Sequence, residues 1–111
     1  MKFAIIIYSN DSETAWNAFR FANTTRSFDN EVNVFLLGKG VEVAMISTLQ
    51  YDVLEQVRLF LESGGKIMGC SVCCESRKSE MPFLLEDLKC EMGSMRHLYA
   101  LVAEADKVLT F

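Results

Sequence analysis

The chain has 111 residues, of which 50% are hydrophobic and 23% are charged. This length supports one domain with one core and excludes a multidomain enzyme, and this composition excludes a disordered or collagen-like chain. The formal net charge is −4, and the longest basic cluster is the pair Arg77-Lys78, so nucleic acid is not an expected partner.

The first residues do not predict a secretion or membrane segment. A short apolar run over 3–8 ends at the polar sequence Ser9-Asn10-Asp11, and no apolar stretch approaches the roughly 18 residues that cross a bilayer. We therefore expect a soluble cytoplasmic protein with no membrane partner. In that compartment the 4 cysteines are expected to be reduced, reactive or metal-bound rather than paired in a disulfide framework.

Strands and helices are expected to alternate along the chain. Continuous runs of β-branched and aromatic residues predict buried strands, and apolar residues at helical spacing after an N-cap residue predict helices. In chain order the predicted elements are a strand at 3–8, a helix at 12–25, a strand at 32–37, a short helix at 41–48, a helix at 53–61, a strand at 66–70, a short strand at 88–92, a helix at 95–105 and a strand at 107–111.

This order predicts an α/β fold. We expect a single domain over residues 1–111, built on a parallel sheet of four or five strands with helices on both faces. In such sheets, functional sites form beyond the carboxyl ends of the strands, where loops converge. The predicted loops at that edge are 9–12, 38–40 and 70–79.

The third of these loops carries the strongest chemical signal in the chain. It contains Cys70, Cys73 and Cys74, and the cations Arg77 and Lys78 follow closely. A neighbouring cation or a helix start favours the thiolate form of cysteine, which is the nucleophile. We therefore expect Cys70 and Cys73 to be the reactive thiols, with Cys74 and the two cations in supporting roles.

Other interpretations of these cysteines stay open. Cys70 and Cys73 have a spacing that zinc accepts, and Cys90 and His97 could complete a ligand set, but a lone Cys and a lone His are weak evidence for a metal. Cys90 is more typical of core packing, and His97 of a helix surface. A thioredoxin-type dithiol normally begins a helix, and the polar residues at 75–79 give that interpretation poor support.

No cofactor or resident metal is expected. The sequence Gly38-Lys39-Gly40 lacks the spacer and the following Ser or Thr of a phosphate-binding P-loop, so it is expected to form a turn.

Four segments resemble the DsrE/DsrF-like family of small α/β proteins, which includes the TusD-type sulfur-relay subunits, and within it the YchN-like branch. They are the helix sequence at 12–22, Val34-Phe35-Leu36-Leu37, Cys70-Ser71-Val72-Cys73 after the third strand, and the closing sequence at 105–111. The resemblance spans nearly the whole chain. It implies an α/β fold, a homotrimer or homohexamer, and sulfur-donor and sulfur-acceptor proteins as partners.

The resemblance also implies roles for two cysteines. Cys70 occupies the position of the cysteine that accepts a persulfide sulfur in relay members, and Cys73 matches the second thiol of the YchN-like branch. The leading hypothesis is that Cys70 holds the sulfur as a persulfide beside Arg77 or Lys78, and that Cys73 is a resolving thiol or a second carrier. The alternative is a non-enzymatic, homo-oligomeric module that binds a metal or a partner through the Cys-rich loop.

Overall fold

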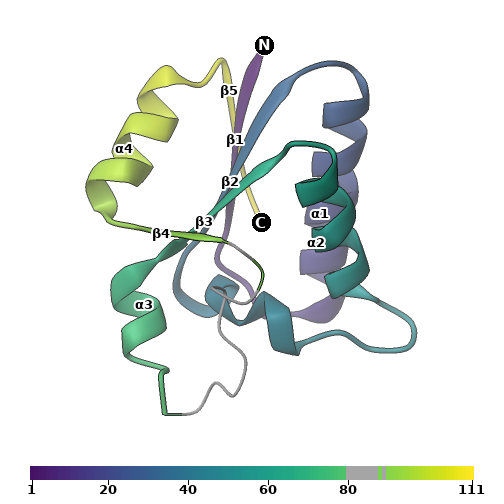
Figure 1. Ribbon diagram of the computed structural model, residues 1–111, viewed down its shortest axis with the longest axis vertical. Helices are drawn as coiled ribbons and strands as arrows, with labels where there is room; N and C mark the ends of the chain where they lie inside the picture. The colour runs from purple at the N-terminus through teal and green to yellow at the C-terminus, as the bar shows by residue number, and fades with distance from the viewer. Residues whose placement is uncertain (80–87, 89) are drawn as a thin grey trace.

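The computed structural model describes residues 1–79, 88 and 90–111 (Figure 1). Its elements are, in chain order, β1 (Lys2–Ile7), α1 (Ser12–Ser27), β2 (Glu31–Leu36), the 3-10 helix η1 (Gly38–Met45), α2 (Val53–Glu62), β3 (Lys66–Cys70), α3 (Ser71–Glu75), β4 (Glu91–Gly93), α4 (Met95–Glu104) and β5 (Lys107–Thr110).

The strands form one five-stranded sheet in the order β4-β3-β2-β1-β5, and all neighbouring strands are parallel. Helices α1 and α2 lie side by side on one face of the sheet, and α4 lies on the other face (Figure 1). The predicted α/β architecture is therefore confirmed. Because every strand is parallel, the carboxyl ends of β1, β2 and β3 meet at one edge, where α3 and η1 lie.

The core lies mainly between the sheet and the pair α1 and α2. Alternate residues of a strand point to the same face, so Ile5 and Ile7 of β1 share a face with Val34 and Leu36 of β2, and all four are buried. Phe19 of α1 meets Phe60 of α2 edge to face, with ring centroids 5.9 Å apart. This packing fixes the framework that carries the loops at the sheet edge.

Acidic residues cap the first turns of α1 and α2. The carboxylate of Asp11 accepts the backbone N–H of Thr14 over 2.9 Å at the start of α1, and Asp52 caps α2 through the N–H of Glu55 over 3.2 Å. Each acceptor satisfies one of the backbone donors that a helix leaves unpaired at its first turn.

Three sequence-based boundaries were wrong. Residues 71–75 form helix α3 rather than a loop, because the backbone turns directly into a helix after Cys70. The short helix expected at 41–48 is instead the 3-10 helix at 38–45. The fourth strand covers 91–93 rather than 88–92, and residue 89 lies outside the described residues.

Helix α4 is less buried than α1 and α2. Its residues Leu98 and Leu101 are half-buried against the sheet, whereas Met95 and Tyr99 are exposed by 61% and 74%. Within the described residues, no helix has both the length and the apolar character that crossing a bilayer requires.

Candidate functional site

Three loops converge at the carboxyl ends of β1, β2 and β3, as the sequence predicted. Asn10, which follows β1, donates a hydrogen bond to Glu42 of η1 over 3.4 Å. Glu42 in turn pairs with Arg77, which follows α3, over 2.9 Å. The backbone N–H of Gly38, after β2, donates to the sulfur of Cys73 over 3.2 Å. This edge of the sheet therefore surrounds the thiol-bearing helix α3 with polar groups from three segments.

Cys70 ends β3 and is the N-cap residue of α3. Its Sγ accepts the backbone N–H of Cys73 over 3.4 Å, so the thiol occupies the place that a hydroxyl or carboxylate usually takes at a helix start. The Cys-x-x-Cys spacing produces this contact, because it puts the second cysteine at the third residue of the helix. Only 5% of Cys70 is exposed, and the residue belongs to the hydrophobic core cluster.

Cys73 is the half-buried member of the pair. Its Sγ accepts the N–H of Gly38, and its own backbone N–H donates to Cys70 Sγ. Burial, and after it the neighbouring Cys70 thiol, raises the pKa of the Cys73 thiol, while the Gly38 N–H and the Arg77 guanidinium act in the opposite direction. Two backbone N–H groups thus link both sulfurs to the ends of β2 and β3.

The structure brings Arg77 to the thiols. Its Nε donates to Glu42, and a terminal nitrogen of its guanidinium donates to the backbone carbonyl of Cys73 over 3.1 Å. Arg77 therefore both favours the anionic form of Cys73 and holds the end of α3. Lys78, the other predicted supporting cation, is exposed, and its backbone N–H donates to the carbonyl of Glu75 over 3.3 Å.

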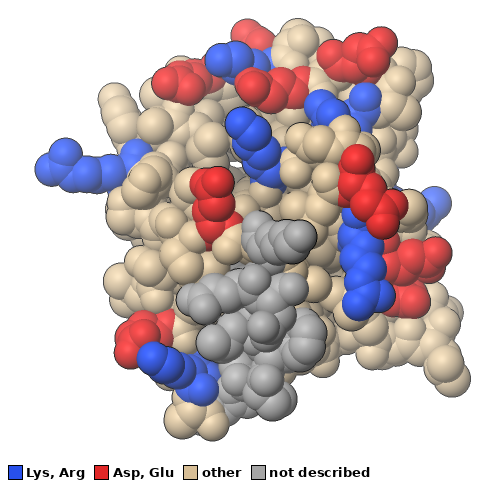
Figure 2. All heavy atoms as spheres, in the orientation of Figure 1, with Lys and Arg blue, Asp and Glu red and all other residues tan. Residues whose placement is uncertain are grey.

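The described part of the face in Figure 2 carries no patch of like charges. Among the described residues on that face, Lys and Arg side chains are interspersed with Asp and Glu side chains.

The other two cysteines lie close to the pair but differ from it. Cys74, on α3, is half-buried. Cys90 is buried in the core cluster, where burial, and to a lesser extent the nearby Cys74, raises its pKa to about 11. Cys90 is therefore a protonated thiol at neutral pH, in agreement with the packing role expected from the sequence.

The described residues do not form a set of metal ligands. His97 lies in the first turn of α4, where its Nδ1 lies 3.0 Å from the backbone nitrogen of Ser94 and forms part of a capping box. In the described segments, no group of three or more His, Cys, Asp and Glu residues is arranged to hold a metal ion.

Sequence reasoning missed Glu42 and the backbone donor at Gly38. Glu42 is the only charged residue in the apolar run Val41-Glu42-Val43-Ala44-Met45-Ile46, and that isolation was the available signal. Gly38 was expected only as part of a turn. Gly38 adopts a φ of +55°, in the left-handed region that favours glycine, and this conformation turns the chain from β2 into η1.

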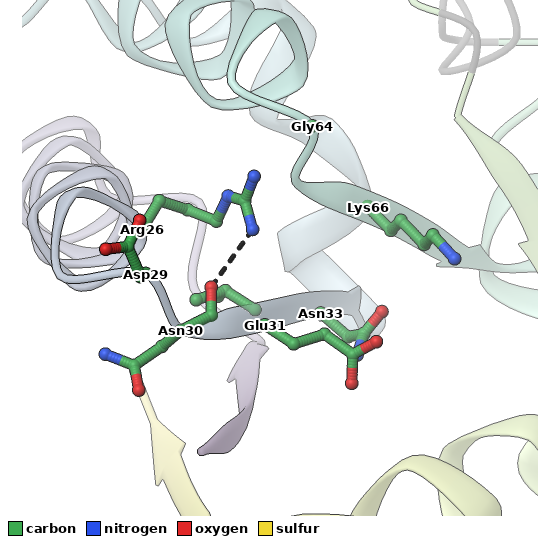
Figure 3. Close-up of a pocket in the computed structure, with 8 residues that line it drawn as sticks. Arg26, Asp29, Asn30, Glu31, Asn33, Gly64 and Lys66 are labelled. Carbon is green, nitrogen blue, oxygen red and sulfur yellow. Dashed lines mark hydrogen bonds between the residues drawn. The ribbon is translucent and has the colours of Figure 1, made fainter.

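A pocket lies at the edge of the sheet opposite the cysteines, near the start of β2 and β3 (Figure 3). Its volume is about 400 Å³, and the side chains around it include Arg26, Glu31 and Lys66. The Arg26 guanidinium donates to the backbone carbonyls of Asn30 and Ser63. Arg26 therefore links the end of α1 to the turn before β3. This pocket is far from the cysteines, and its arginine has a structural role.

The comparisons with known proteins agree on one family. The model of the DsrE/DsrF-like family matches residues 1–111. An uncharacterized protein of Methanocaldococcus jannaschii is 37% identical, and the match covers 100% of both chains. An uncharacterized protein of Methanopyrus kandleri is 29% identical over 89% of this chain and 83% of its own length.

Solved structures share the fold. The crystal structure of the YchN protein from E. coli has a TM-score of 0.81 at 22% identity, with 100% of both chains covered. The structure of a conserved protein of unknown function from Bacteroides thetaiotaomicron has a TM-score of 0.81 at 23% identity, covering 99% of this chain and 94% of that chain.

Proposed function

The chain belongs to the DsrE/DsrF-like family, and from this premise we propose that it is a sulfur carrier, which takes up a sulfane sulfur as a cysteine persulfide on the pair Cys70 and Cys73. The observation that carries the proposal is the placement of these two cysteines at the start of α3, with a backbone N–H directed at each sulfur. The family's link to sulfur relay supports the same chemistry.

The transfer itself is a thiol exchange. A cysteine thiolate attacks the outer sulfur of a donor persulfide, a new S–S bond forms on the protein, and the donor leaves as a thiolate. The reverse reaction with an acceptor thiolate would unload the sulfur. No electrons are gained or lost overall, so the carrier needs no cofactor or metal for this step.

Two groups beside Cys73 favour an anionic sulfur and oppose the burial that raises its pKa. The Gly38 N–H points at its Sγ, and Arg77 is the nearby cation that favours its negative charge. Sulfur donor and acceptor proteins are the proposed partners, and the reducing cytoplasm, which keeps the thiols free, is the proposed compartment. A homotrimer or homohexamer is the proposed assembly.

The rival role is a metal-binding module that uses the same loop. The two roles are separated by elemental analysis of protein purified without chelator, because persulfide transfer needs no metal. The carrier role predicts far less than one metal ion per chain. A stoichiometric metal that disappears in Cys73→Ser would favour the module instead.

Mass spectrometry tests the carrier role directly. The reduced protein is incubated with glutathione persulfide, separated from it, and weighed intact, while sulfide in the solution is measured. Sulfur uptake is registered either as an adduct of one sulfur atom, about 32 Da, or as sulfide released after uptake. Uptake should persist in Cys74→Ser, the matched control beside the pair, and should be lost in the double variant Cys70→Ser/Cys73→Ser. An adduct that survives in the double variant would refute the assignment to this pair.

A further inference from the structure

We infer that Cys73 is the thiol that receives the sulfur and that Cys70 then attacks the loaded Cys73, so that the protein releases sulfide and closes a Cys70–Cys73 disulfide. The inference rests on the proposed function and adds to it an order of the two thiols and a product. It also differs from the expectation drawn from the sequence, in which Cys70 accepts the sulfur.

Access to the donor favours Cys73. A persulfide carried by another thiol has to bring its outer sulfur into contact with the attacking atom. Cys70 is 5% exposed and packs in the core cluster, whereas Cys73 is half-buried. The thiol nearer to solvent is therefore the second cysteine of the motif rather than the first.

Backbone geometry holds the Cys73 sulfur in place for this reaction. The Gly38 N–H donates to Cys73 Sγ over 3.2 Å, and Gly38 begins η1, which is tied to Arg77 through Glu42. The end of α3 is held as well, because Arg77 donates to the Cys73 carbonyl. Two separate contacts thus fix the same residue, one at its sulfur and one at its backbone.

The structure places the Cys70 sulfur next to Cys73. The backbone N–H of Cys73 donates to Cys70 Sγ over 3.4 Å, so the first thiol lies at the turn that carries the second. The Cys73 sulfur attacks the donor as its thiolate, the form that the nearby Arg77 guanidinium favours.

The first step is loading. The Cys73 sulfur bonds to the outer sulfur of the donor persulfide, the S–S bond of the donor breaks, and the donor leaves as a thiolate. The protein now carries the Cys73 persulfide beside the Cys70 thiol.

The second step is release. The Cys70 sulfur bonds to the inner sulfur of the Cys73 persulfide, the outer sulfur leaves, and it takes the Cys70 proton, so the product is hydrogen sulfide. The two cysteines lose two electrons in forming the disulfide, and the sulfane sulfur gains them. A small thiol reductant then reduces the disulfide and restores the pair.

The test compares four proteins treated with glutathione persulfide without other reductant: the native chain, Cys70→Ser, Cys73→Ser and the control Cys74→Ser. Serine at position 70 keeps an N-cap acceptor, so α3 is expected to stay folded in Cys70→Ser. Circular dichroism of each variant checks folding, and a protein-free blank corrects for sulfide that the donor releases alone.

The native chain and Cys74→Ser should release about one sulfide per chain and lose about 2 Da, the two hydrogens of a new disulfide. Cys70→Ser should keep an adduct of about 32 Da on Cys73 and release sulfide at least about ten-fold more slowly. Cys73→Ser should do neither.

Three other results would each contradict a different part of the proposal. An adduct kept by Cys73→Ser and absent from Cys70→Ser would make Cys70 the acceptor and overturn the order, while the carrier role stands. A native chain that keeps its adduct without releasing sulfide would overturn the release step. Neither adduct nor sulfide in any of the four proteins would remove the proposed function itself.

Discussion

Arg77 and Glu42 form an ion pair at 2.9 Å that joins the end of α3 to η1. The two side chains are 23% and 25% exposed, so solvent screens this pair less than it would a fully exposed one. Glu42 touches neither cysteine through a described hydrogen bond. It acts as a positioning residue, because it orients the guanidinium that holds the Cys73 carbonyl.

Replacing Glu42 by glutamine should change the reactivity of the Cys73 thiol. Loss of the carboxylate leaves the positive charge of Arg77 without its partner, which favours the Cys73 thiolate, so alkylation of Cys73 by iodoacetamide at fixed pH should become about two- to three-fold faster. Stability should fall by about 1 kcal/mol, measured by urea unfolding. The control is Glu62→Gln, an exposed acid at the end of α2. Equal alkylation rates in Glu42→Gln and the native chain would show that the Glu42 carboxylate does not offset the charge of Arg77 at Cys73.

Cys90 should make the protein less stable in alkali. Burial raises the pKa of this thiol from 9.0 to about 11 in the folded chain, whereas the unfolded chain ionises it near the ordinary value. Unfolding therefore releases a proton between these limits, so the contribution of Cys90 to stability is full below about pH 9 and is lost as the pH rises towards about 11.

Urea unfolding of the native chain and Cys90→Ala across that pH range measures this effect. The variant should start about 1 kcal/mol less stable, because a buried side chain is shortened, and its stability should fall less steeply with pH. Other groups that titrate in alkali are shared by the two proteins, so the difference between the slopes isolates Cys90. Parallel slopes would show that Cys90 does not have the raised pKa.

The sequence predicted the sheet well because the signal for each strand is local. The run Phe3-Ala4-Ile5-Ile6-Ile7 has to be buried on both faces, and only a central parallel strand provides that. The convergence of three loops followed from the parallel strands, and the hydrogen bonds of Asn10, Glu42 and Arg77 confirm it. General rules of α/β topology were sufficient for this part of the site.

Local signals could not reveal the rest of the site. Helix α3 has only five residues, too few for an apolar period to show, and it starts because the Cys70 thiol caps it. The contact of Gly38 with Cys73 joins residues 35 positions apart through a backbone group, which has no sequence signature. The relative burial of the two thiols likewise depends on the packing of the whole edge.

Two glycines at the start of η1 should respond differently to alanine. A Cβ at Gly40 would overlap the backbone carbonyl oxygen of Ile7, so Gly40→Ala should cost about 3 kcal/mol or more, because backbone atoms have to move. A Cβ at Gly38 would meet no atom within 4 Å, so Gly38→Ala should cost only about 1 kcal/mol for its positive φ.

Urea unfolding of the two variants measures this difference. Gly38→Ala is the matched control because it changes the same segment by the same methyl group and keeps the N–H that Cys73 accepts. Similar losses in the two variants would mean that η1 is free to move away from β1, and the close approach at Gly40 would not be a constraint.

We expect the proposed oligomer to form through the exposed face of helix α4. Met95, Tyr99 and Val102 are exposed apolar residues spaced by four and three, so they lie along one stripe of the helix. Removing that stripe from water would provide the association energy, and Tyr99→Asp should place an unpaired charge within it. Light scattering after size-exclusion chromatography should therefore find a trimer or hexamer for the native chain and a monomer for Tyr99→Asp.

The matched control is Leu59→Asp, since Leu59 is 46% exposed on α2, on the opposite face of the sheet. This variant makes the same kind of apolar-to-acidic change and should keep the native assembly. If Leu59→Asp dissociates and Tyr99→Asp does not, the interface lies on the α2 side. A native chain that is monomeric at micromolar concentration would show that the α4 stripe does not mediate self-association.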